Sequence, residues 1–127
     1  MSKILIIEDD QVIANTLLNS LIDSGFDAFI AQDAYQGTKL VYDKSPDLII
    51  LDLMLPAGGG QTVLKNIRLS TKTKNIPVVI LTGVQDEELK NKIIKEGVSA
   101  YMEKPVELDK LIAAIKNILG VSKDSQP

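Results

Sequence analysis

The sequence predicts an α/β domain in which a parallel β-sheet is covered by helices on both faces. Short apolar runs rich in β-branched residues alternate with longer amphipathic runs, giving five strand–helix units in 127 residues. This alternation is typical of a doubly wound (βα)5 fold with right-handed crossovers. The length and the 45% apolar content are those of one domain with one core. We expect this domain to span residues 1–120, with 121–127 as a polar tail or a truncated linker.

Five runs are expected to be strands because they are short, apolar and rich in Ile, Leu and Val. They are residues 3–7, 28–31, 48–51, 76–81 and 100–102. The first, third and fourth are almost uniformly apolar, as expected of central parallel strands covered on both faces. The second and fifth strands are therefore expected at the edges, which gives the strand order 2-1-3-4-5.

Apolar residues with a 3.6-residue period predict helices between the strands. The first such pattern covers 13–22 and the last 108–119, and each is followed by a glycine suited to end a helix. The pattern at 34–42 contains Gly37, which costs about 1 kcal/mol in a helix relative to alanine. Segment 86–96 has only a thin apolar stripe, so we expect a weakly anchored helix that can move or bind a partner.

The composition excludes several kinds of chemistry. The chain has no cysteine and no histidine, which rules out disulfides, thiolate chemistry, histidine-dependent triads and the usual zinc sites. It cannot carry a phosphohistidine, so any phosphoryl group must come from another molecule. A net charge of −3 without a basic run disfavours direct nucleic-acid binding. No apolar run approaches the roughly 20 residues that span a bilayer, so we expect a cytoplasmic protein without membrane insertion.

Polar side chains follow the carboxyl ends of the predicted strands, where ligands bind in open parallel sheets. Glu8 and Asp9 follow the first strand and Asp52 follows the third. Because these strands are expected to be neighbours, the three carboxylates should converge in one crevice, flanked by Thr82 and Lys104. A hard divalent cation offsets their repulsion, and Mg²⁺ suits a site with few carboxylates. Asp52 beside Mg²⁺, a lysine and a hydroxyl is arranged as a nucleophile that forms an aspartyl phosphate.

Each feature has a simpler explanation when it is taken alone. The acidic run 8–10 could cap a helix, Asp52 could be a turn residue, and Thr82 a strand-end hydroxyl. Their joint occurrence at the strand ends favours phosphoryl transfer. An aspartyl phosphatase would need a second Asp as general acid where Met54 stands. A flavin-binding protein would need a phosphate loop where the acidic run would repel phosphate.

The chain resembles the receiver domain of two-component response regulators over about residues 2–120. The matching motifs are ILIIEDD (4–10), DLIILDLMLP (47–56), LTG (81–83) and AYMEKP (100–105). The resemblance implies a flavodoxin-like fold and a signalling switch in which Asp52 is phosphorylated by a sensor histidine kinase or phosphotransfer protein. Such a protein catalyses only its own phosphorylation and dephosphorylation, so we do not class it as an enzyme. The alternative is a phosphorylation-independent interaction module on the same fold.

The resemblance also implies a Mg²⁺ site made by Glu8, Asp9, Asp52 and the main-chain oxygen of Met54. Asp9 would bind the ion directly and Glu8 through water. The side chains two residues after Asp52 and Thr82 tune the phosphoryl lifetime in this family. Here they are Met54 and Val84, neither of which can orient an attacking water, and we expect slow self-dephosphorylation.

Further roles implied by the resemblance concern the switch. Thr82 and Lys104 would each contact a phosphoryl oxygen, Gly83 would leave room for the group, and the peptide bond before Pro105 would be cis. On phosphorylation Thr82 would move toward the phosphoryl group and Tyr101 would rotate inward. The face made by the fourth helix, fifth strand and fifth helix would then be remodelled. A downstream protein, an effector domain or a second copy in a phosphorylation-dependent homodimer would bind there.

The sequence departs from the family pattern in two places. Residues 57–60 read Ala-Gly-Gly-Gly, where relatives more often have a bulkier residue and an acidic one before a single glycine. We expect this glycine run to make the loop flexible. Ser99 and Ala100 stand where many DNA-binding relatives have acidic residues that pair across a dimer.

Overall fold

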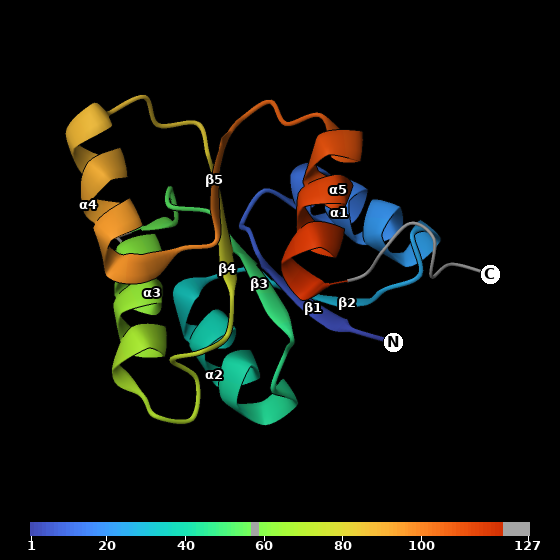
Figure 1. Ribbon diagram of the computed structural model, residues 1–127, viewed down its shortest axis with the longest axis horizontal. Coiled ribbons are helices and arrows are strands. Elements are labelled where there is room, and N and C mark those ends of the chain that lie inside the picture. The colour runs from blue at the N-terminus through green and yellow to red at the C-terminus, as the bar shows by residue number, and fades with distance from the viewer. Residues whose placement is uncertain (57–58, 121–127) are drawn as a thin grey trace.

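The computed structural model describes residues 1–56 and 59–120, which form three layers with a β-sheet between two layers of helices (Figure 1). The strands are β1 (Lys3–Ile7), β2 (Asp27–Ala31), β3 (Leu48–Leu51), β4 (Val78–Thr82) and β5 (Ala100–Glu103). The helices are α1 (Gln11–Asp23), α2 (Ala34–Lys44), α3 (Gly59–Leu69), α4 (Glu87–Gly97) and α5 (Leu108–Leu119). The tail expected at 121–127 lies outside the described residues.

All strand pairs are parallel and their order is β2-β1-β3-β4-β5, which confirms the predicted fold class and strand order. Helices α1 and α5 cover one face, and α2, α3 and α4 cover the other (Figure 1). Successive strand residues point to opposite faces. In β1, Ile4 and Ile6 contact the α1 and α5 layer, whereas Leu5 and Ile7 contact the other. Burial on both faces therefore explains the uniformly apolar central strands.

Strands β1 and β3 have the expected bounds, and the other three differ from expectation by one or two residues. The clearest case is β4, which was expected at 76–81 and instead covers Val78–Thr82. Pro77 precedes it and has no backbone N–H to donate to a neighbouring strand. Its carbonyl still accepts a hydrogen bond from the Ile49 N–H at 3.0 Å. The regular ladder of β4 therefore begins after the proline.

Two glycines of the run at 57–60 occupy the first turn of α3 and are buried, contrary to the expectation of a flexible loop. A Cβ on Gly60 would lie 2.6 Å from the main-chain oxygen of Asp52, and one on Gly59 would lie 2.8 Å from the Cβ of Ala34. Both residues thus permit close packing of α3. Ala57 and Gly58 lie outside the described residues.

Helix α4 is held to the rest of the molecule by few apolar contacts. Asp86 caps its first turn by accepting a hydrogen bond from the Leu89 N–H, and Ile93 is its one buried residue. This agrees with the thin apolar stripe seen in the sequence. No helix among the described residues is long and apolar enough to cross a bilayer.

We predict that Gly60→Ala lowers the free energy of unfolding by about 1–3 kcal/mol, because the new methyl group meets backbone atoms that cannot rotate away. Urea denaturation of the two proteins measures the difference. Gly83→Ala is the matched control, since nothing lies within 4 Å of its added Cβ. Equal stability of the two alanine variants would contradict the packing role of Gly60.

Candidate functional site

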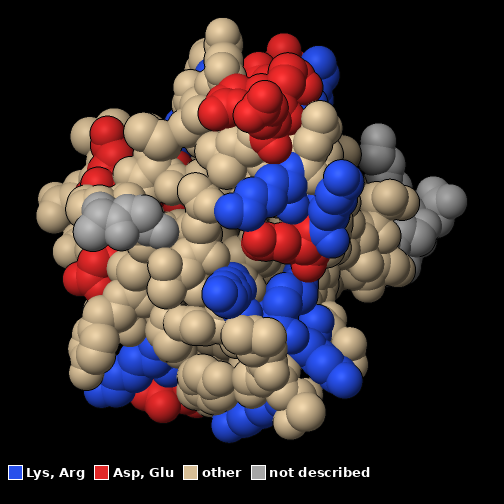
Figure 2. Space-filling view, turned by 90° about the vertical axis from the view of Figure 1, so that its left-hand side faces the viewer, with Lys and Arg blue, Asp and Glu red and all other residues tan. Residues whose placement is uncertain are grey.

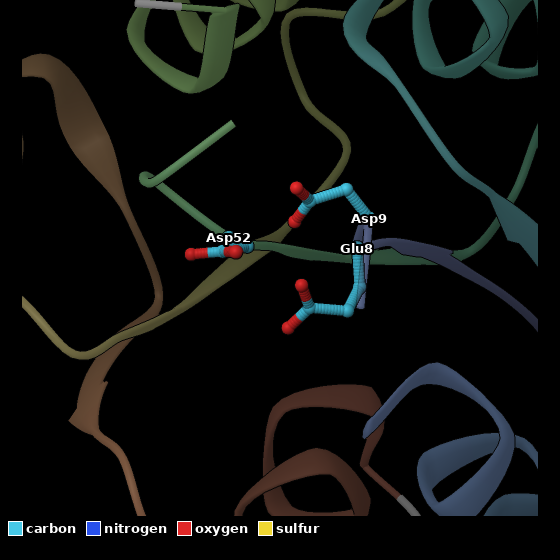
Figure 3. Close-up of side chains that lie close together, drawn as sticks. All are labelled: Glu8, Asp9 and Asp52. Carbon is cyan, nitrogen blue, oxygen red and sulfur yellow. The ribbon is translucent and has the colours of Figure 1, made fainter. Parts of the chain in front are cut away.

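Three carboxylates gather at the carboxyl edge of the sheet, where β1 and β3 end side by side. Ile7 is paired with Leu51, and the Asp52 N–H donates to the Ile7 carbonyl at 3.0 Å. Glu8 and Asp9 follow β1, so their side chains reach the same space as that of Asp52 (Figure 3). One carboxylate oxygen from each of the three residues lies within 4.8 Å of the others. The convergence expected from strand order is therefore present.

The cluster is buried on one side and open on the other. Glu8 is 2% exposed and Asp52 is 4% exposed, whereas Asp9 is exposed. The Asp10 N–H donates to Glu8 Oε2 at 3.2 Å, and the Met54 N–H donates to Asp52 Oδ1 at 2.9 Å. These backbone donors fix the direction of the two buried carboxylates. The open side, marked by Asp9, is where a ligand can enter.

Lys104 provides the positive charge of the site. Its ammonium donates to Glu8 Oε1 at 2.5 Å and lies 3.4 Å from Asp52 Oδ2. The Lys104 N–H donates to the Thr82 carbonyl at 2.8 Å, and the following peptide bond to Pro105 is cis. The lysine thus reaches across the sheet from the end of β5 and joins both buried carboxylates.

Burial and charge act in opposite directions on this ion pair. Burial raises the pKa of Glu8 to about 7, although the hydrogen bond from Lys104 pulls that pKa down. Burial would by itself lower the pKa of the Lys104 ammonium. The hydrogen bond to Glu8 and the charge of Asp52 outweigh burial and raise it. Lys104 therefore stays charged where a negatively charged group would be bound.

Thr82 ends β4 with a fully buried side chain next to this cluster. Its hydroxyl accepts a hydrogen bond from the Val84 N–H at 3.1 Å. A Cβ built on Gly83 would meet nothing within 4 Å, so the space beside Thr82 is open. The Met54 side chain is 59% exposed at the rim of the site.

Tyr101 lies in β5 and packs inward against α4. Its hydroxyl is buried and has no hydrogen-bond partner among the described residues. Burial raises the pKa of this phenol, and the nearby charges of Glu103, Asp86 and Glu87 raise it further. The Lys90 ammonium lies 5.5 Å from the ring centroid. The ring is therefore partly buried against the core on the α4 side of the sheet.

An apolar pocket of about 440 Å³ beside Lys104 was not predicted from the sequence. Side chains of α1, the end of β4 and the segment after Lys104 line it, including Val12, Leu81 and Val106. Val12 is 76% exposed, which is unusual for a valine in an amphipathic helix. The apolar pattern read from the sequence began at residue 13 and gave no sign of this pocket.

A sequence model of the response regulator receiver domain matches residues 4–116. The chain is 35% identical to the transcriptional regulator RpaA of Synechocystis over 94% of its length and 49% of that protein. It is 33% identical to the phosphate regulon regulator PhoB of Escherichia coli, over 92% of this chain and 51% of the relative. The chain thus spans about half the length of these relatives.

Solved receiver domains have the same fold. The receiver domain of the Francisella response regulator 1452 superposes with a TM-score of 0.83, at 32% identity over 94% of this chain and 96% of the other. A receiver domain protein from Methanospirillum hungatei gives a TM-score of 0.88, at 25% identity over 99% of both chains.

We predict that Mg²⁺ stabilises the protein through the three carboxylates, because an ion that binds only the folded state raises its stability. The free energy of unfolding rises by about 2.7 kcal/mol when the Mg²⁺ concentration is a hundred times its Kd. Thermal unfolding of metal-stripped protein with and without MgCl₂ measures the effect. Asp9→Asn and Asp52→Asn are expected to lose it.

Asp10→Asn is the matched control for these variants. It removes one negative charge next to Asp9, from a side chain that caps α1 and is not in the proposed ligand set. Asparagine caps a helix nearly as well as aspartate, so this variant should keep both its stability and the Mg²⁺ effect. Full retention of the Mg²⁺ effect in Asp52→Asn would contradict the proposed ligand set.

Proposed function

The chain belongs to the response regulator receiver domain family, and we propose that it is a phosphoacceptor switch that takes a phosphoryl group on Asp52. The observation that carries this proposal is the contact of a buried Asp52 carboxylate with Lys104 beside two further acidic groups. Family membership implies that the donor is a phosphohistidine on a histidine kinase or phosphotransfer protein, and this donor must be another molecule because the chain has no histidine. The chain modifies only itself and is not an enzyme toward other substrates.

In the proposed step, a carboxylate oxygen of Asp52 attacks the phosphorus in line with the donor nitrogen. The new P–O bond forms as the P–N bond breaks, and the leaving imidazole nitrogen keeps the electron pair. The Met54 N–H holds Asp52 Oδ1, which fixes the carboxylate before the attack. The Lys104 ammonium turns from Asp52 to a phosphoryl oxygen. The Thr82 hydroxyl donates a hydrogen bond to a second phosphoryl oxygen.

The residues of the site fit Mg²⁺. The cluster offers carboxylate oxygens only, with one open side on which the ion can keep several waters. Glu8, Asp9, Asp52 and the main-chain oxygen of Met54 form the proposed ligand set. When bound, the cation offsets the charge of the carboxylates and of the incoming phosphoryl oxygens. Lys104 alone faces three carboxylates, so a second cation is needed before another anion enters.

The output proposed for the switch is a change in the surface made by α4, β5 and α5. Tyr101 belongs to β5 of that surface, and Lys90 of α4 lies over its ring. A downstream protein, an effector domain or a second copy of the chain would bind there. The apolar pocket is lined in part by Lys104, which contacts Asp52, so a donor protein that approaches Asp52 can rest against it.

Acetyl phosphate with Mg²⁺ is expected to add one phosphoryl group to the protein, because the site itself activates Asp52. Intact-mass spectrometry measures the gain, and EDTA is expected to abolish it. Asp52→Asn should gain nothing. Asp47→Asn, which alters an exposed carboxylate that accepts from the Lys3 N–H, should gain as much as the wild type. A folded, Mg²⁺-binding protein that no donor phosphorylates would favour the phosphorylation-independent module.

The aspartyl phosphate is expected to be long-lived, because neither Met54 nor Val84 can orient water. Met54→Asn should shorten the lifetime of the aspartyl phosphate by roughly tenfold. This change is smaller than the rate increase that a positioned general base gives. The decay is followed by mass spectrometry after removal of the donor. Met54→Leu is the control of similar volume and should leave the lifetime unchanged. A longer phosphoryl lifetime in the asparagine variant would contradict the hypothesis that Met54 slows self-dephosphorylation.

A further inference from the structure

A groove of about 420 Å³ lies between α3 and α4, away from the carboxylate cluster. Its lining includes Lys65 and Arg68 from α3 and Lys92 and Glu96 from α4, with Leu69 at one end. None of these residues takes part in the phosphoryl chemistry proposed above. The groove is thus a separate feature of the surface.

The surroundings of this groove are basic although the chain carries a net charge of −3. Residues 53–85 contain four basic residues and no acidic one, and α4 adds three lysines. Figure 2 shows basic side chains over the middle and lower part of this face, with acidic side chains between them in the middle and a larger acidic patch at the top. That patch lies over the first turn of α4, which contains Glu87 and Glu88. The basic side chains of this face therefore lie away from the first turn of α4, and three of them line the groove.

The cations of the groove are available to a ligand to different degrees. Lys65 and Lys92 are exposed and form no ion pair with any residue that the structure describes. Arg68 is fixed, since its Nε donates to the Gly97 carbonyl at 2.8 Å and its Nη1 to the Ile76 carbonyl at 2.9 Å. One cation held by hydrogen bonds and two exposed cations in the same lining suit an anionic ligand.

Two further residues indicate what kind of anion fits. Leu69 is 72% exposed, so one end of the groove offers an apolar contact. Glu96 places a negative charge within the lining. A nucleic acid has closely spaced phosphates and would meet this charge, whereas a peptide can leave a neutral residue opposite it. The rest of the acidic surface also repels a long polyanion.

We propose that the α3–α4 groove docks an acidic segment of a partner protein, with carboxylates on Lys65 and Lys92 and an apolar side chain on Leu69. Complementary charge guides the encounter, and the apolar contact adds affinity that salt does not screen. This surface shares α4 with the one made by α4, β5 and α5, but it lies on the side of α4 that faces α3. The docking does not depend on phosphorylation of Asp52.

The probe for this proposal is a short fluorescent peptide of alternating Glu and Leu, titrated at physiological ionic strength and followed by fluorescence anisotropy. We expect saturable binding to the wild type. Lys65→Glu combined with Lys92→Glu should weaken it by about tenfold or more, which corresponds to about 1.4 kcal/mol. Leu69→Ser should also weaken it, and Asp52→Asn should leave it unchanged.

Lys39→Glu combined with Lys116→Glu is the matched control, because it makes the same change in net charge on α2 and α5. If these two substitutions weaken peptide binding as much as the groove substitutions do, the attraction is nonspecific and the proposal is overturned. The absence of saturable binding to the wild type would also overturn it. Tighter binding of a single-stranded oligonucleotide, lost in the groove variant, would overturn it in favour of a nucleic acid. Thermal unfolding of each variant checks that the fold is intact.

Discussion

The pairing of Lys104 with two buried carboxylates is the interaction on which the carboxyl edge of the sheet depends. Removing a carboxylate from water costs several kcal/mol, and the cost rises when a second one lies beside it. One ammonium at 2.5 Å from Glu8 and 3.4 Å from Asp52 offsets part of this cost. Since Asp9 adds a third negative charge nearby, the site keeps an excess of negative charge. That excess is what makes the crevice attractive to a cation.

Backbone geometry keeps this unfavourable cluster together. Parallel pairing sets the ends of β1 and β3 side by side, so the residues that follow them cannot separate. Helix α3 then packs so closely on the main chain of Asp52 that only a glycine fits at position 60. The neighbouring residues of β1 and β3 are fully buried apolar side chains. The free energy gained by burying that core therefore outweighs the repulsion at its edge.

The fold and the membership of the carboxylate cluster were predictable because they follow from local patterns. Uniformly apolar runs mark central strands, and the position of a residue just after a strand fixes the edge of the sheet where it lies. The helical state of Gly59 and Gly60 was not predictable, since it depends on contacts with Asp52 and Ala34, which are distant in sequence. The same holds for Arg68, whose hydrogen bonds reach Gly97.

Helix α4 is held to the rest of the molecule by contacts that each contribute little free energy. Burial of Ile93 contributes about 1.5–3 kcal/mol. The charged hydrogen bond from Arg68 to Gly97 at its end contributes about 1.5–3 kcal/mol. The contact of Lys90 with the Tyr101 ring adds about 0.5–1 kcal/mol. Polar contacts thus weigh as much as core packing in this helix.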